Sequence, residues 1–207
     1  MKHIIFLFLL IVVSCKKSEN RKEKVIPKDG TLDLKYEVLN QLISETESEE
    51  KFTDSYVYNI SLMPISLEIP INTSELPPPP PGFGIRLNYD SIFISKDSAY
   101  YRNEMQIFKN FKFDKNKISK NLQFTTDEEL FKLSQNRKSD FWTEFHKKYG
   151  IKCMQSFSVP FFNKDKTKCV VQHSFSCGYL NGRGYTAIYK KVDGKWIEVR
   201  TFDHWIS

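Results

Sequence analysis

The sequence reads YTAIYKKVDGKWIEVRTF over residues 185–202. At its centre, Asp193-Gly194 favours a two-residue hairpin turn, because a type I′ turn needs positive φ at both central positions. The residues on either side are rich in β-branched and aromatic side chains, which are typical of strands. The stretch therefore predicts a β-hairpin with strands over residues 185–191 and 196–202.

The turn also determines which residues of the two strands face each other. Lys191 should lie opposite Trp196, and Ile188 opposite Val199. Bulky side chains occupy both faces of this hairpin, so we expect helices on one side of the sheet and a second layer or a loop on the other.

The two-residue period continues upstream of this hairpin. Apolar and polar side chains alternate from Phe157 to Phe161 and again from Cys169 to Cys177. These two runs predict another hairpin, and residues 154–202 as a whole predict an antiparallel meander.

Further upstream, apolar residues recur with the period of a helix. The pattern predicts helices near residues 31–46, 95–110 and 126–149, the last of them broken around 134–139. Runs of helix followed by runs of strand, without βαβ alternation, predict one α+β domain over residues 31–207. In this domain the helices pack on an antiparallel C-terminal β-meander.

The first fifteen residues have the arrangement of an export signal. A basic start is followed by an apolar run over residues 4–13, which is too short to span a bilayer. Val12-Val13-Ser14-Cys15 closes the run and resembles the lipobox of bacterial lipoproteins. The resemblance implies cleavage before Cys15 and attachment of diacylglycerol and an acyl chain to that cysteine. An uncleaved anchor and an ordinary signal peptide with a chance cysteine are the alternatives.

These features predict a signal peptide over residues 1–14, a polar tether over 15–30 and a lipid-anchored domain in the cell envelope, on the periplasmic side or at the cell surface. The formal net charge of the whole chain is +6. The basic tether can lie on anionic headgroups or act only as a solvated spacer. Nucleic acid is not expected as a partner, because no binding motif accompanies the basic composition.

Export would place the remaining cysteines in an oxidising compartment. The apolar positions of both strands of the upstream hairpin have odd numbers, so facing residues must have an even sum. A loop centred on Asp165 places Cys153 opposite Cys177, and Phe161 opposite Cys169. We therefore predict a Cys153–Cys177 disulfide and a buried thiol at Cys169. A register slip of two residues would instead leave all three thiols free.

Residues 177–184 read CGYLNGRG and form the densest local signal in the chain. Gly178, Gly182 and Gly184 could bring backbone amides close to an anion, helped by Arg183, which would make this run a binding loop. The alternative is a hairpin bulge that needs glycine for positive φ.

The C-terminal residues carry a second resemblance. Ser158-x-Pro-x-Phe162, the run over 177–184, Gly194-Lys195-Trp196 and Trp205-Ile206-Ser207 together resemble a group of small bacterial lipoproteins, over roughly residues 90–207. The group offers no activity to transfer, so the resemblance supports only the fold class and the location.

No acid–base pair, activated nucleophile or metal-ligand spacing is recognisable in the sequence. We therefore expect a non-catalytic binding or structural protein without a cofactor, whose partners are the membrane, through Cys15, and an envelope protein. A periplasmic immunity or inhibitor lipoprotein is the alternative. An enzyme with a dispersed site near His173 and Arg183 is a third reading, which would require a pocket that joins both residues to an acidic side chain.

Overall fold

The computed structural model describes residues 28–49, 56–61, 65–68, 85–136 and 138–207. The signal peptide, Cys15 and most of the tether lie outside these residues, so their assignments remain predictions. Within the described part of the chain, no helix is both long and apolar enough to cross a membrane.

The described elements comprise helices, short 3-10 turns and strands. The helices are α1 (Leu32–Glu49), α2 (Ser98–Lys109), α3 (Asp127–Ser134) and α4 (Phe141–Tyr149), with η1 (Ser95–Asp97) and η2 (Lys115–Lys117) between them. The strands are β1 (Tyr56–Ser61), β2 (Ile65–Glu68), β3 (Ile85–Asn88), β4 (Phe124–Thr125), β5 (Cys153–Ser158), β6 (Phe161–Phe162), β7 (Lys168–Ser176), β8 (Gly182–Val192) and β9 (Lys195–Ile206).

The expected α+β fold with an antiparallel C-terminal meander is confirmed. The main sheet has the order β4-β1-β5-β7-β8-β9, with β6 also paired to β7. Neighbouring strands along β5-β7-β8-β9 are antiparallel, whereas β1 lies parallel to both β4 and β5. The sheet is therefore mixed at the β1 side, which the sequence pattern did not predict.

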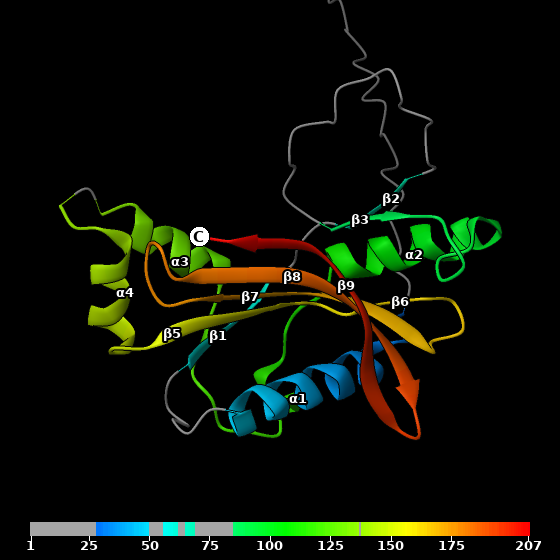
Figure 1. Cartoon of the computed structure of the whole chain (residues 1–207), viewed down its shortest axis with the longest axis horizontal. Coiled ribbons are helices and arrows are strands. Elements are labelled where there is room, and N and C mark those ends of the chain that lie inside the picture. Colours follow the sequence, from blue (N-terminus) through cyan, green and yellow to red (C-terminus); the bar gives the residue numbers. More distant parts are fainter. Residues whose placement is uncertain (1–27, 50–55, 62–64, 69–84, 137) are drawn as a thin grey trace, which may run out of the picture.

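Both faces of the sheet are covered, as the bulky side chains require. Figure 1 shows α1 along one face, and α2 with the two-stranded β2–β3 sheet over part of the other. The buried side of α1 consists of apolar residues at helical spacing, including Leu39 and Ile43. Trp196, at the start of β9, is clamped to the same helix, because Gln41 exchanges hydrogen bonds of 2.7 and 2.8 Å with its backbone.

Residues 126–149 form two helices, α3 and α4, and the break between them lies where the sequence pattern predicted it, after Ser134. The side chain of Thr126 caps α3 by accepting a hydrogen bond from Glu129 N, and Asp140 caps α4 by accepting one from Thr143 N. Gly150, with φ of 85°, ends α4. In Figure 1 these two helices lie at the end of the sheet where β7 turns into β8.

The register of the final hairpin is correct near its turn and wrong farther away. Lys191 pairs with Trp196 as expected, and both turn residues have positive φ. Ile188, however, pairs with Arg200 and not with Val199. The register shifts between Ile188 and the next residue, because a bulge adds one residue to β9.

The upstream hairpin shows the same kind of error. Phe157 pairs with His173, which confirms the even sum. Phe161 pairs with Val170 and not with Cys169. Pro160 lies between β5 and β6 and has no N–H to donate, so the ladder is interrupted there and resumes one residue out of step.

Candidate functional site

A disulfide joins Cys153 and Cys177, the pair predicted from the register. Their Cα atoms are 4.3 Å apart, and the adjacent residues Met154 and Ser176 pair directly across β5 and β7. Cys169 is a buried free thiol, and burial raises its pKa. The bridge thus fastens the ends of two central strands, next to the turn that leads into β8.

Of the four residues expected in a glycine-rich binding loop, only Gly178 lies in the turn between β7 and β8. Gly182, Arg183 and Gly184 belong to β8, and their backbones are paired with β7 and with the C-terminal end of β9. Their amides are therefore committed to the sheet instead of being available to an anion. The alternative, a hairpin bulge that needs positive φ, is correct in part: β7 and β8 form a hairpin, and the β8–β9 register shifts between Gly184 and Thr186. The positive φ is wrong, because among the described glycines only Gly150 and Gly194 have it.

Two of these glycines make room for the indole of Trp205. A Cβ built on Gly184 would lie 2.7 Å from Trp205 Cζ2 and even closer to other ring atoms. A Cβ on Gly182 would lie 2.6 Å from Ser207 Oγ and 3.3 Å from Trp205 Cζ3. Gly178, in the turn, has no atom within 4 Å of such a Cβ. The spacing of the glycines therefore reflects ring packing.

Gly184→Ala is expected to lower the free energy of unfolding by about 2 kcal/mol, because the added methyl must displace the indole of Trp205. The matched control is Gly178→Ala, which places the same methyl in open space. Urea unfolding followed by tryptophan fluorescence measures both variants. Equal stabilities for the two would contradict this account of Gly184.

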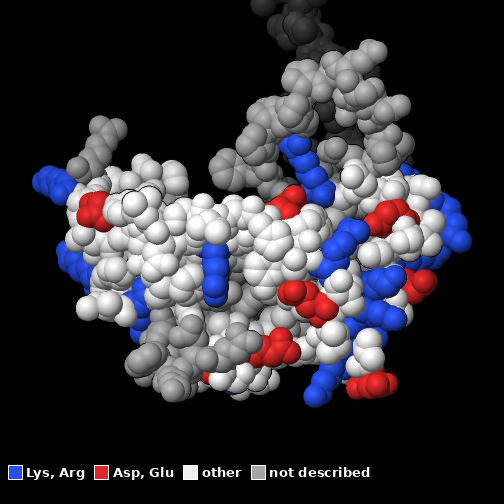
Figure 2. Space-filling view, in the orientation of Figure 1, with Lys and Arg blue, Asp and Glu red and all other residues white. Residues whose placement is uncertain are grey.

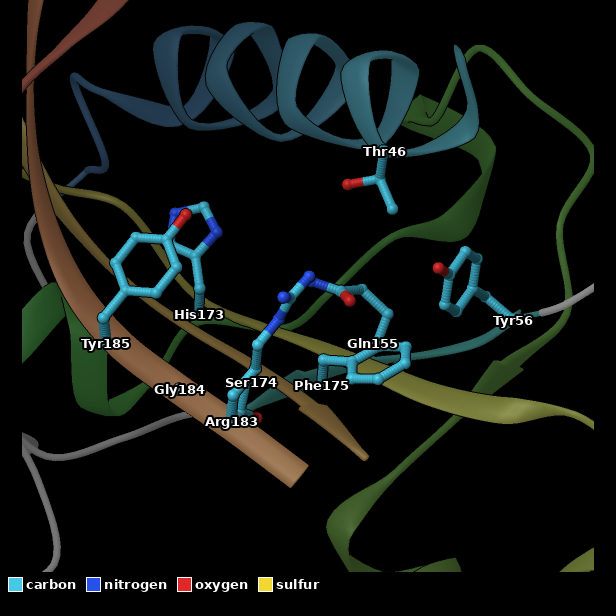
Figure 3. Close-up of a pocket in the computed structure, with 9 residues that line it drawn as sticks. All are labelled: Thr46, Tyr56, Gln155, His173, Ser174, Phe175, Arg183, Gly184 and Tyr185. Carbon is cyan, nitrogen blue, oxygen red and sulfur yellow. The ribbon is translucent and has the colours of Figure 1, made fainter. Parts of the chain in front are cut away.

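A cleft of about 130 Å³ lies where the C-terminal half of α1 passes over the end of the sheet (Figure 3). Strands β1, β5, β7 and β8 form its floor and α1 forms its rim. Its lining residues are Thr46, Tyr56, Gln155, His173, Ser174, Phe175, Arg183, Gly184 and Tyr185. His173 and Arg183, the two residues proposed for a dispersed site, thus share one cleft. No sequence pattern indicated Thr46, Tyr56 or Gln155, because these residues line the cleft only through the placement of α1, β1 and β5 next to one another.

The polar groups of the cleft are suited to bind a negatively charged group. Gln155 is only 8% exposed, and its side-chain amide, which points into the cleft in Figure 3, has no hydrogen-bond partner among the described residues. The guanidinium of Arg183 lies 5.6 Å from the ring centroid of Phe175. No Asp or Glu is among the lining residues, so nothing in the lining neutralises Arg183.

His173 forms a rigid, neutral wall of the cleft. Its Nε2 lies 2.8 Å from Tyr189 Oη, and its ring stacks on Tyr185 with centroids 4.8 Å apart and 5° between planes. Burial lowers the pKa of His173 to about 4, so the imidazole is uncharged near neutral pH. The positive charge of the cleft therefore comes from Arg183.

A row of rings crosses the sheet and includes this wall. Each strand of the main path contributes one ring, and neighbouring centroids are 4.8 to 6.3 Å apart. The row consists of Phe124, Tyr58, Phe157, His173, Tyr185 and His204. Such stacked and edge-on contacts add to the packing energy and hold the rings in place, so His173 and Tyr185 present a preformed surface to a ligand.

The cleft lacks the acidic side chain that the enzyme reading requires. His173 and Arg183 meet there, but the lining contains no carboxylate that could act with them as an acid or base. Among the described residues, no group of three or more His, Cys, Asp or Glu side chains is placed to hold a metal ion. The arrangement is suited to binding an anionic group between aromatic walls.

No protein-family model, curated protein or solved structure matches this chain. The functional conclusion therefore depends on the chemistry of the cleft and on the signals in the sequence.

Proposed function

We propose that this chain is a lipid-anchored, non-catalytic binding protein of the cell envelope, whose cleft receives a carboxylate-bearing group of an envelope protein. The observation that carries the proposal is that Arg183 and the side-chain amide of Gln155, which has no hydrogen-bond partner among the described residues, line the same cleft, and that this lining contains no acidic side chain. A guanidinium and an amide N–H donate to carboxylate oxygens in charge-assisted hydrogen bonds. The lipobox residues at Cys15 support the anchor.

The size of the cleft favours an end group over a whole small molecule. Its volume of about 130 Å³ is below the range of roughly 300–1,000 Å³ that holds drug-sized ligands. An acidic side chain or a chain terminus of a partner protein needs only this much space. The aromatic rings of Tyr185 and Phe175 would contact the apolar part of that group, and Arg183 its charge.

Replacing Arg183 should weaken binding of a carboxylate without disturbing the fold, because this side chain is exposed and forms no ion pair with a described residue. A photo-crosslinking residue placed at Thr46, on the rim of the cleft, should form a discrete adduct with one envelope protein in intact cells. We expect Arg183→Gln to reduce that adduct at least about tenfold, since a charged hydrogen bond contributes roughly 1.5–3 kcal/mol. Arg183→Lys, which keeps the charge, should retain more of it.

The crosslinker at Thr143, an exposed position on α4, is the control and should not form the same adduct. An adduct of equal yield in Arg183→Gln, or the absence of any protein adduct from the Thr46 position, would contradict the proposal. With the purified protein, benzoate serves as a probe carboxylate. Its addition should shift the NMR signals of the Gln155 side-chain amide in the wild type and not in Arg183→Gln.

An immunity or inhibitor protein is the second candidate, and the turn after β7 favours it. Tyr179 and Leu180 at this turn are 63% and 89% exposed, yet the turn is fastened by the adjacent disulfide and by a 2.9 Å hydrogen bond from Tyr179 Oη to Asp140. A rigid, protruding apolar tip is a suitable element for blocking a partner's active site. A crosslinker at Leu180 that captures a hydrolase or toxin, with loss of that enzyme's activity, would favour this candidate.

A further inference from the structure

The end of the domain where the tether enters is opposite the cleft and is rich in lysine. Three segments meet there: the entering chain at 28–31, the β6–β7 loop at 163–167 and the β8–β9 turn. Lys166 Nζ donates to Gly30 O at 3.0 Å, and Lys191 N donates to Thr167 O at 2.9 Å, which ties these segments together. Strand β7 runs from this end at Lys168 to the cleft at Phe175.

We name this end the tether-end surface. It consists of Lys28, Lys96, Lys164, Lys166, Lys168, Lys190 and Lys195. In Figure 2, Lys and Arg side chains lie at the right of the view, with Asp and Glu side chains among them. Asp29 pairs with Lys35 and Asp97 with Lys164, each at 2.7 Å, and Asp165 and Asp193 also lie in these segments. Seven lysines against Asp97, Asp165 and Asp193 leave positive charge in excess.

The opposite end of the molecule has no such excess. There, α3 carries three acids in its first turn, and Glu128 and Glu129 pair with Lys132 and Lys148 at 2.6 and 3.0 Å. The positive charge of the chain is thus directed toward the end that leads to Cys15.

Lys168 and Lys190 are the clearest sign that the tether-end surface meets an anion. They pair directly across β7 and β8, and neither forms an ion pair with a described residue. Like charges placed opposite each other destabilise a sheet. Both lysines also lie on the same side of the sheet, so one negatively charged surface could contact them together.

We propose that the tether-end surface lies on anionic lipid headgroups, so that the domain stands on the membrane with its cleft directed away. The inference rests on the lipid anchor of the proposed function but not on any partner of the cleft. A basic residue near an anionic leaflet contributes about fivefold to membrane affinity. Because the attraction decays within about 8 Å at physiological salt, only residues held close to the lipid contribute.

The test uses the full chain, purified in detergent from its own envelope and reconstituted into nanodiscs of phosphatidylcholine with or without phosphatidylglycerol. Hydrogen exchange read by mass spectrometry should slow several-fold in segments 163–168 and 189–195 on the anionic discs only, and 0.5 M salt should remove the protection. Free inorganic phosphate added to neutral discs should not reproduce it, which separates a lipid surface from a soluble anion. Lys168→Glu/Lys190→Glu should abolish the protection.

The matched control is Lys138→Glu/Lys147→Glu, which makes the same charge change at two exposed lysines near α4 that form no ion pair with a described residue, and it should keep the protection. Equal exchange on both kinds of disc, protection on the α4 side, or protection by phosphate alone would overturn the inference. If the full chain does not associate with the discs at all, both the membrane-facing surface and the proposed lipid anchor at Cys15 are contradicted. Loss of binding at the cleft is measured separately by crosslinking, so failure of one proposal is distinguishable from failure of the other.

Discussion

Replacing Cys153 and Cys177 together by serine is expected to lower the free energy of unfolding by about 3 kcal/mol. The bridge closes a loop between residues 24 apart in sequence, which removes much of the conformational freedom of the unfolded chain. Urea unfolding of the wild type and of the double variant measures the difference. The effect exceeds that of Gly184→Ala because it acts on a whole loop and not on one ring.

Reductant provides the internal control for this prediction. Dithiothreitol should destabilise the wild type by a similar amount and leave the double variant unchanged, since Cys169 is buried and unpaired. The bridge also lies two residues from Gln155 on β5 and from Phe175 on β7, so its loss should weaken benzoate binding as well. A double variant as stable as the wild type, or one that still responds to reductant, would show that this bridge does not stabilise the fold.

The features that were predictable from sequence depend on neighbours along the chain. Asp193-Gly194 determines a turn by backbone conformation, and the register follows from it as far as Lys191 and Trp196. The Cys153–Cys177 pair follows from the apolar periodicity of β5 and β7, which requires an even sum, although the loop position alone misplaces Phe161 by one residue. The turn holds because a two-residue loop leaves few alternative pairings.

The features that were missed depend on contacts between distant segments or on local irregularities. Strand β1 enters the sheet parallel to β5, nearly a hundred residues later in the chain, and no sequence period reports such a pairing. The bulge that moves Val199 out of register and the positive φ of 53° at Asp203 likewise leave no pattern that can be read in advance. The space that Gly184 leaves for Trp205 depends on the course of β9, and the position of Gln155 in the cleft depends on the pairing of β1 with β5.

His173 should make the stability of the fold depend on pH. The residue is 7% exposed, and burial lowers its pKa from 6.5 to about 4 in the folded protein. Between these values the unfolded chain binds more protons than the folded one, so stability is complete above pH 6.5 and falls as the pH decreases toward 4. The loss attributable to His173 over this interval is about 3 kcal/mol.

The matched variant is His173→Gln, which does not titrate and offers Tyr189 Oη a hydrogen-bonding partner. At pH 7 it should be less stable than the wild type, because it lacks the stacking against Tyr185 and the edge contact with Phe157. Burial raises the pKa of Glu104, which gives a contribution of opposite sign, but both proteins contain Glu104 and it cancels in the comparison.

Urea unfolding at intervals from pH 7.5 to 4 should therefore show two curves that converge as the pH falls, with the wild type losing about 3 kcal/mol more than His173→Gln. NMR titration of the His173 ring checks the cause directly, with an expected midpoint near 4. Parallel stability curves, or a ring midpoint near 6.5, would show that His173 is not held neutral by burial.

If His173 is not held neutral, a second positive charge lies beside Arg183 in the cleft at mildly acidic pH, and carboxylate binding should strengthen as the pH falls through 6.5. If burial holds the ring neutral, benzoate affinity should instead stay constant from pH 7.5 to about 5.5, since Arg183 keeps its charge over this range.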